Sequence, residues 1–299
     1  MKRFFPSALF ALIFVLGAPS LSRADLMVST GGEKGTYHAM FLSIKAACGE
    51  KVPLTEQISN GSDENLERLV QNQATLAIVQ ADALQFQAMN DPRVSDERIR
   101  TLVVLHPEEV HIIVKAGLKV GGNIIGFGGH APKTLQDLQG QKVGVWGGSY
   151  TTAMVMNTQG QLGMNVVRFD DATKALEAFE KDAVQAIIAV GGQPLGFVNG
   201  LDQRFSLLSV NDPAKFSFYV PAKLNYRKLN AQGVPTIAAQ ALLVTRNLKT
   251  PAKREEILAL RTCILKNLGE FQERAGHHPK WQDVDPSAMS VRAFYGQKK

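Results

Sequence analysis

The sequence predicts an α/β protein built largely from parallel βαβ units. Short apolar runs of strand length alternate with segments of helical periodicity along almost the whole chain, unlike the evenly spaced short strands of an all-β sandwich. One run, residues 186–190, is entirely apolar, which is typical of a strand buried on both faces of a parallel sheet. With 299 residues and 45% apolar composition, the chain can bury a sizeable core and is long enough for about two domains.

The first third of the chain contains elements with clear boundaries. We expect a strand at Leu26–Ser29 and a helix over Thr36–Cys48, where apolar side chains recur at four-residue spacing. A second helix begins at Ser62, a suitable N-cap, and carries acidic residues in its first turn, where the helix dipole favours negative charge. A strand is expected at Leu76–Gln80, a helix at 83–89, and two long strands at 101–105 and 110–115.

After a glycine-rich insert at residues 117–130, the alternation of strands and helices resumes. Strands are expected at 142–146, 166–169, 186–190 and 207–210, and helices at 151–162 and 172–181. The C-terminal part is predicted to form one long amphipathic helix over residues 252–274, followed by a polar tail.

The N-terminus predicts export. A basic start at Lys2 and Arg3 precedes an apolar run at residues 8–16 and a small-x-small sequence ending at Ala24, which together describe a signal peptide over residues 1–24. An anchoring helix is the alternative, but the apolar run is interrupted and spanning needs about 20 predominantly apolar residues. We therefore expect a periplasmic protein cleaved near Ala24.

Charge and cysteine content exclude several classes of protein. The formal net charge of +6 includes three basic residues of the expected signal peptide, and the remaining charges are too balanced and scattered for a nucleic-acid-binding face. Two cysteines, Cys48 and Cys263, are too few for a disulfide framework or a cysteine-ligated metal centre. The six histidines form no evident ligand set, so neither a metal nor another cofactor is expected.

Two loops share one design: a strand, a pair of glycines, hydroxyl and tyrosine side chains, and then a helix. Residues 28–37 read Val-Ser-Thr-Gly-Gly-Glu-Lys-Gly-Thr-Tyr, and residues 145–151 read Val-Trp-Gly-Gly-Ser-Tyr-Thr. Glycines let the backbone approach a ligand closely, and free N–H groups at a helix start favour an anionic or polar group. Either loop alone is also consistent with an ordinary βα turn, but their recurrence favours a paired binding cleft.

These motifs belong to a longer pattern that resembles the TAXI family of periplasmic solute receptors, which is associated with TRAP transporters. The matching segments are Thr-Gly-Gly-x-x-Gly-Thr-Tyr at 30–37, Leu-Ala-Ile-Val-Gln-Ala-Asp at 76–82, Glu-Val-His-Ile-Ile-Val at 109–114, Leu-Gln-Asp-Leu-Gln-Gly-Gln-Lys-Val-Gly-Val at 135–145 and Val-Gly-Gly-Gln-Pro at 190–194. They occur in the right order over nearly the whole mature chain. The resemblance implies a two-lobed type II periplasmic binding protein, with hinge strands and a central ligand cleft.

The resemblance also implies a division of the chain and a set of ligand-binding residues. Residues 25–105 and 207–299 are expected to form lobe I, and residues 106–206 lobe II. The chain departs from the family at Glu33, Lys34, His38 and Tyr150, so the ligand of better-known relatives is not carried over. The residues expected to bind the ligand are Thr30, Gly35, Thr36, Tyr37, Gln80, Asp82, Ser149, Tyr150, Thr151, Gly191 and Gly192.

Three of these expectations carry alternatives. Asp82 is also well placed to cap the helix that follows it, and no cation for a carboxylate is evident, although Lys34 is a candidate. A disulfide between Cys48 and Cys263 is expected, because both fall in helical segments of the first lobe and the export route is oxidising. Two separately buried thiols are the alternative.

The expected function is capture of a small polar or anionic metabolite, an organic acid or amino acid, by a monomer whose hinge closes without catalysis. Delivery to a TRAP-type membrane permease is expected, and a receptor for a membrane sensor kinase is the nearest alternative. A periplasmic hydrolase ranks lower, because a base must be brought to Ser149 by folding. The G-x-G-x-x-A match at residues 126–131 is followed directly by Pro132, which favours a loop over a dinucleotide site.

Overall fold

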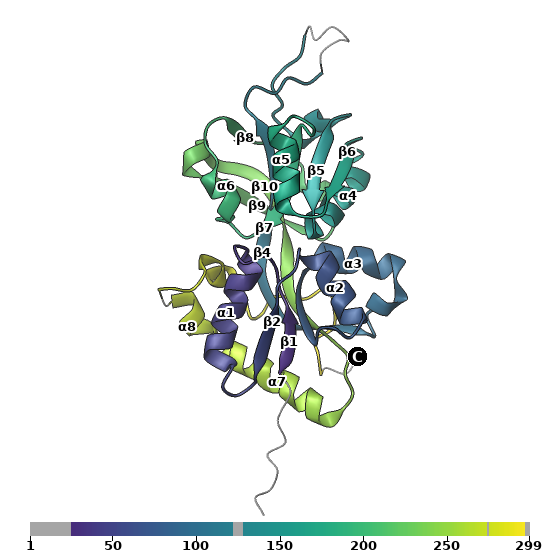
Figure 1. The fold of residues 1–299 in the computed structure, drawn as a ribbon, viewed down its shortest axis with the longest axis vertical. Helices are drawn as coiled ribbons and strands as arrows, with labels where there is room; N and C mark the ends of the chain where they lie inside the picture. Colours follow the sequence, from purple (N-terminus) through teal and green to yellow (C-terminus); the bar gives the residue numbers. More distant parts are fainter. Residues whose placement is uncertain (1–24, 122–127, 274, 297–299) are drawn as a thin grey trace, which may run out of the picture.

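The computed structural model describes residues 25–121, 128–273 and 275–296. The expected signal peptide, and residues 122–127 of the glycine-rich insert with the start of its G-x-G-x-x-A match, lie outside the described residues. The molecule has two lobes, joined by long strands that run from one lobe into the other (Figure 1). Within the described ranges, no helix has the length and apolar character needed to cross a membrane.

The strands form one mixed sheet in the order β2-β1-β3-β10-β4-β7-β5-β6, with β8 paired to β4 and β9 to β10. Each lobe contains parallel pairs, in which β1 pairs with β2 and β3, and β5 pairs with β6 and β7, whereas β8 and β9 pair antiparallel with β4 and β10. The two long strands β4 and β10 are antiparallel to each other and to their neighbours β7 and β3. The strand bounds are β1 Leu26–Ser29, β2 Leu54–Gln57, β3 Leu76–Gln80, β4 Ile99–Lys115, β5 Lys142–Trp146, β6 Asn165–Phe169, β7 Ala186–Gly191, β8 Phe205–Leu207, β9 Tyr219–Tyr226 and β10 Ala231–Arg246.

The helices cover the sheet in both lobes (Figure 1). In the first lobe they are α1 Thr36–Cys48, α2 Ser62–Val70, α3 Ala81–Asn90, α7 Pro251–Lys266 and α8 Leu268–Glu273, and in the second α4 Gly148–Gly160, α5 Ala172–Glu180 and α6 Gly196–Gly200. A short 3-10 turn, η5 Pro279–Asp283, follows α8. Asp171 caps α5 by accepting from the Lys174 N–H, whereas Ser62, the expected N-cap of α2, is its first residue.

Each lobe has its own hydrophobic core, and β4 contributes to both. Leu102 and Leu105 pack with the α1 and α7 side chains of the first lobe, whereas Val110 and Ile112 pack with the side chains around α4 in the second. The chain therefore passes between the lobes at residues 106–109. This crossing brings the carboxyl ends of the parallel strands of both lobes toward the same interface.

The return crossing lies within β10. Residues 207–299 were expected in the first lobe, but the buried side chains Leu208, Val210 and Phe216 pack with Val110 in the second, as does Ile237 of β10. From Ala241 onward, β10 packs in the first lobe. The segment from 208 to 237 stays in the second lobe because β9 pairs along the first half of β10.

Four of the expected elements differ clearly from the structure. The two strands expected at 101–105 and 110–115 are one strand, β4, which accommodates Pro107 opposite Gln240 beside a register shift in β10. The long C-terminal helix expected over 252–274 is interrupted after Lys266, where the Asn267 side chain donates to the Cys263 carbonyl oxygen at 2.8 Å. The strand expected at 207–210 is displaced to β8, and the sequence interpretation contained no strand at β2, β9 or β10.

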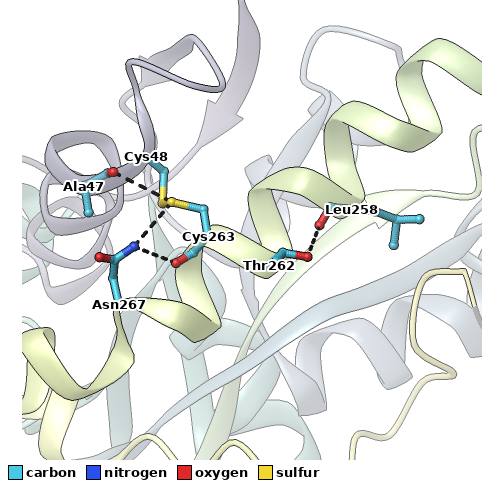
Figure 2. Close-up of a disulfide and its surroundings, with 6 residues drawn as sticks. All are labelled: Ala47, Cys48, Leu258, Thr262, Cys263 and Asn267. Carbon is cyan, nitrogen blue, oxygen red and sulfur yellow. Dashed lines mark hydrogen bonds between the residues drawn. A yellow bond between two sulfur atoms is a disulfide. The ribbon is translucent and has the colours of Figure 1, made fainter.

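The predicted disulfide is confirmed. Cys48, the last residue of α1, is bonded to Cys263 near the end of α7, with a Cα–Cα distance of 5.9 Å (Figure 2). The bridge links two segments 215 residues apart in sequence and sits within the core of the first lobe. It therefore fastens the C-terminal helix to the first helix of the chain.

Candidate functional site

A cavity of about 710 Å³ lies between the two lobes. Its walls come from the loops that follow β1, β2, β5 and β7, together with Gln80 at the end of β3 and Glu108 on the crossing strand β4. In α/β sheets, ligands bind beyond the carboxyl ends of parallel strands, which is where these loops lie. The lining residues are Gly31, Gly32, Lys34, Gly35, Thr36, Tyr37, Ser59, Asn60, Gly61, Ser62, Gln80, Glu108, Trp146, Gly148, Ser149, Ala172, Val190, Gly191, Leu195, Gly196 and Phe197.

The first glycine loop forms a tight turn at the start of α1. The Gly35 N–H donates to the Gly32 carbonyl oxygen at 2.7 Å, and α1 begins at the next residue, Thr36. Gly35 is the extended N-cap and has no side chain to satisfy the first N–H groups of the helix. Gly35, Thr36 and Tyr37 line the cavity, so the start of α1 lies at its wall, a position that suits a polar or anionic ligand.

The second glycine loop permits close contact between the lobes. A Cβ atom on Gly147, whose φ is +47°, would lie 1.8 Å from the Asn60 carbonyl oxygen. A Cβ atom on Gly148 would lie 2.0 Å from Oε1 of Gln80 and 2.9 Å from Oγ of Ser62. Only glycine fits at Gly147, where the neighbour is backbone, and a side chain at Gly148 would require the Gln80 and Ser62 side chains to move.

Aromatic and aliphatic side chains of the second lobe form an apolar wall. The rings of Trp146 and Phe197 meet edge to face with centroids 5.7 Å apart, and Leu195 lies beside them. This wall faces the polar loops of the first lobe. The cavity thus combines a flat apolar surface with converging polar groups, as small-molecule sites do.

Glu108 is the buried acidic group of the cavity, with 4% of its surface exposed. The pKa of its carboxyl is raised to about 8, chiefly by burial and with smaller contributions from the charges of Asp82 and Glu109, against the lowering effects of Tyr37 and Lys280. Tyr37 donates its hydroxyl to Oε2 of Glu108 at 2.5 Å. At neutral pH the cleft therefore holds a largely protonated carboxyl group in a hydrogen-bonded position.

Polar contacts join the lobes beside the cavity. Thr151 of α4 donates to Oδ1 of Asp63 in α2 at 3.0 Å, and the Arg168 guanidinium lies 3.4 Å from the other oxygen of Asp63. Burial raises the pKa of Asp63, and the bonds from Thr151 and Arg168 oppose that rise. The structure therefore shows the two lobes in contact across the cleft.

Asp82 makes a second set of contacts between the lobes. Its Oδ2 accepts from Thr152 of α4 and from the Tyr219 hydroxyl of β9, both at 2.6 Å. Asp82 is almost fully buried, and this burial raises its pKa. Its side chain ties α3 to the second lobe and does not line the cavity.

Six of the eleven residues expected to bind a ligand line the cavity: Gly35, Thr36, Tyr37, Gln80, Ser149 and Gly191. Thr36 also contacts the opposite lobe, because its hydroxyl lies 3.4 Å from the Gly192 carbonyl oxygen. The Ser149 hydroxyl accepts from the Val190 N–H at 3.0 Å, so it connects the loops after β5 and β7.

The other five expected residues lie outside the cavity lining. Thr30 donates to Oε1 of Glu56 at 2.6 Å, and Asp82 and Thr151 form the contacts between the lobes described above. The ring of Tyr150 lies 4.8 Å from the Arg168 guanidinium carbon. Gly192 is packed against the side chains of Lys280 and His106.

Several lining residues were missed by the sequence interpretation. The loop from Ser59 to Ser62 was considered only as a helix start, although its Asn60-Gly61 pair is a turn signal of the kind that marks a functional βα loop. Glu108 lies between the two strands expected at 101–105 and 110–115 and was not among the residues expected to bind the ligand. No local signal identifies it, because its position depends on where β4 crosses between the lobes.

The described residues contain no group of three or more His, Cys, Asp or Glu side chains placed to hold a metal ion. His106 and His111, the pair on β4, have separate surroundings: His111 shares a hydrogen bond of 2.7 Å with the Tyr226 hydroxyl. Burial lowers the pKa of His111 to about 4 and that of His106 well below its usual value. Both imidazoles are therefore neutral packing elements of the hinge strand.

The two lobes and the strands that cross between them give the chain the two-lobed fold of type II periplasmic binding proteins. The structure is similar to that of a mutant ArgBP from T. maritima, at 13% identity and a TM-score of 0.52, covering 83% of this chain and 90% of that one. It is also similar to a Salmonella typhimurium periplasmic binding protein studied for its high arginine specificity, at 13% identity and a TM-score of 0.52, covering 84% and 98%. A protein from Archaeoglobus fulgidus aligns at 14% identity and a TM-score of 0.53, covering 88% and 84%.

The sequence itself defines the family. The profile of the NMT1-like family matches residues 28–268, and the chain belongs to this family. None of the curated protein sequences matches the chain significantly. The matched range includes both glycine loops, both crossing strands and the disulfide.

Proposed function

We propose that this protein is a periplasmic solute receptor that captures a small polar or anionic metabolite, an organic acid or amino acid, between its two lobes. The observation that carries the proposal is the cavity of about 710 Å³ at the interface, built from four loops at strand ends of both lobes. The similar structures include a periplasmic binding protein with arginine specificity, which supports a solute of amino-acid size.

The proposed contacts divide by chemistry. The free N–H groups at the start of α1 and the hydroxyl of Thr36 would hold the oxygen atoms of the solute. Trp146 and Phe197 would pack against its carbon skeleton. Lys34 lines the same cavity from an exposed position and would pair with a carboxylate of the solute.

The remaining expected residues support the site in this proposal. Tyr37, Gln80, Ser149 and Gly191 would shape the cavity wall. The expected residues outside the cavity lining would stabilise the loops and the closed arrangement of the lobes; they are Thr30, Asp82, Tyr150, Thr151 and Gly192. A solute that contacts both lobes favours the closed state and shifts the population toward it.

Binding without chemical conversion accounts best for the loop geometry. The hydrolase alternative needs the Ser149 hydroxyl as a nucleophile, but this oxygen accepts from the Val190 N–H and thereby holds the β7 loop in place. We propose that the loaded receptor delivers its solute to a TRAP-type permease, as the resemblance to the TAXI family implies. A sensor kinase is the other possible recipient, and the gene neighbourhood distinguishes the two.

The decisive experiment compares two glycine variants in the second lobe. Gly148→Ala places a Cβ atom against Gln80 and Ser62 and so opposes closure, whereas Gly200→Ala, at the exposed end of α6, meets no atom within 4 Å. Amino acids and organic acids are first screened against the unaltered protein by thermal shift, because a bound solute raises the melting temperature. Binding of each hit is then measured by calorimetry.

We expect Gly148→Ala to weaken solute binding by about tenfold or more, since the closed state then requires the Gln80 and Ser62 side chains to leave their places in the cavity wall, and Gly200→Ala to leave affinity within about twofold. Full affinity in Gly148→Ala, or chemical turnover of the bound compound, contradicts the proposal. Thr158→Ala, in α4 well beyond its first turn, is a second control that should retain affinity.

A further inference from the structure

A second cavity, of about 800 Å³, lies at the end of the first lobe that faces away from the cleft. It is formed where β4 begins and β10 ends, and Arg100 is paired there with Thr245 in the β4–β10 ladder. Glu108, which lines the cleft, lies eight residues further along β4. At about 3.3 Å per residue, this separation is roughly 25 Å, so the two cavities are distinct.

The lining of this cavity is strongly cationic. It contains Arg93, Arg98, Arg100, Arg246 and Lys249, against the single acidic side chain of Glu97. Arg93 is neutralised by an ion pair of 2.7 Å with Asp91. For the other four cations, the described part of the chain provides no carboxylate within ion-pair distance.

Arg100 is the residue that indicates a bound ligand. Its side chain is 9% exposed and lines the cavity, and its Nη1 is buried without a hydrogen-bond partner among the described residues. Nε of Arg246 is buried and unpartnered in the same way, while Nη1 of Arg246 donates to the neutral side chain of Asn72. A buried guanidinium without a partner is costly, and a bound anion would supply the missing acceptors.

We propose that this cavity is a second binding site, which takes a multiply charged phosphate-type oxyanion. The forks of Arg100 and Arg246 would bind the oxygen atoms from within, because a guanidinium matches a phosphate group with two parallel hydrogen bonds. Arg98 and Lys249 are exposed at the rim and would add the charge that favours a multiply charged group over a single carboxylate. The phosphate group has two possible sources, a free phosphate compound or the headgroup of a phospholipid.

The experiment measures binding of inorganic pyrophosphate to the mature chain, residues 25–299, by calorimetry at low ionic strength. Arg100→Met removes the buried fork, and Arg98→Gln removes an exposed charge at the rim without disturbing the core. Arg204→Gln is the matched control, because Arg204 is an exposed arginine of the second lobe that is paired with Asp202. In parallel, the same variants are sedimented with vesicles of phosphatidylglycerol and, for comparison, of phosphatidylcholine.

We expect Arg100→Met to weaken pyrophosphate binding by about tenfold or more and Arg98→Gln by about threefold, with Arg204→Gln within about twofold. Binding only to phosphatidylglycerol vesicles, with the same dependence on Arg98, supports the site with a lipid headgroup as its source. Binding to neither probe, or equal losses in Arg98→Gln and Arg204→Gln, overturns the proposal. Gly148→Ala should bind pyrophosphate normally, and a loss there would place the anion in the cleft and overturn the second site.

Discussion

Glu108 should make the stability of the protein fall as the pH rises from acid to neutral. Its carboxyl has a pKa of about 8 in the folded protein, against an ordinary value of 4.5. Below pH 4.5 it is protonated in both states and contributes nothing to the pH dependence. Between pH 4.5 and 8 the folded state keeps a proton that the unfolded chain releases, so rising pH favours unfolding.

The size of this effect follows from the width of that interval. Each pH unit costs about 1.4 kcal/mol of unfolding free energy, so the window from pH 5 to pH 8 corresponds to roughly 4 kcal/mol. Glu108→Gln keeps the shape and the hydrogen bond with Tyr37 but removes the titration. The substitution should therefore leave stability almost unchanged at pH 5 and increase it by roughly 4 kcal/mol at pH 8 relative to the unaltered protein.

Urea unfolding followed by tryptophan fluorescence at several pH values between 5 and 8 measures this difference, since Trp281 is fully buried in the first lobe. Glu50→Gln, the same change at an exposed carboxyl, provides the control and should follow the unaltered protein. Tyr37→Phe removes a hydrogen bond that lowers the pKa of Glu108. The unfolding free energy of this variant should therefore keep falling up to a higher pH than that of the unaltered protein. If the curves for Glu108→Gln and the unaltered protein run parallel from pH 5 to 8, the buried carboxyl does not behave as described.

Three further predictions address stability and closure. Replacing Cys48 and Cys263 by serine should lower the unfolding free energy by about 5 kcal/mol, because the bridge closes a loop with a separation of 215 residues; an unchanged urea midpoint would contradict this. Lys280→Met should lower the unfolding free energy by about 3 to 5 kcal/mol, because Glu109 stays buried without its charged partner. The double variant with Glu109→Gln should recover part of this loss in the same assay. Asp63→Asn weakens a contact between the lobes, so it should reduce solute affinity severalfold. The melting temperature of the solute-free protein should fall by no more than about 2 °C. A larger fall would indicate that Asp63 acts in folding and contradict this prediction.

Elements with strong local signals could be predicted from the sequence to the residue. The helix Thr36–Cys48 and the strands Leu26–Ser29 and Leu76–Gln80 have the expected bounds, because the helix has apolar periodicity between Gly35 and Gly49 and the two strands are short apolar runs between polar segments. β10 was missed although residues 237–244 read Ile-Ala-Ala-Gln-Ala-Leu-Leu-Val, an apolar run typical of a buried strand, whereas β9 carries no comparable local signal. The first half of β10 is stabilised by pairing with β9, and its second half by a place between β3 and β4, which only the folded sheet provides.

The same distinction applies to the candidate site. The two glycine loops could be found because a pair of glycines before a helix is a local pattern with a physical meaning. Trp146 lies directly before the second loop, yet its place in the cavity wall depends on Phe197, 51 positions away in sequence, which packs against its ring. The apolar wall is therefore a property of tertiary packing and not of either segment alone.

Two adjacent glutamates show how the crossing strand links the cleft to the C-terminal segment. Successive side chains of a strand point to opposite faces, so Glu108 faces the cavity and Tyr37, while Glu109 bonds to Lys280 of η5 at 2.6 Å. The second oxygen of Glu109 accepts from the Gln193 N–H at 2.9 Å, at the start of the loop that carries Leu195 and Phe197 into the cavity. Lys280 of η5 therefore contacts, through Glu109, both the crossing strand β4 and the loop that forms one wall of the cleft. If the wall moves as the proposed closure requires, the Glu109–Lys280 pair must move with it or the bond to Gln193 must break.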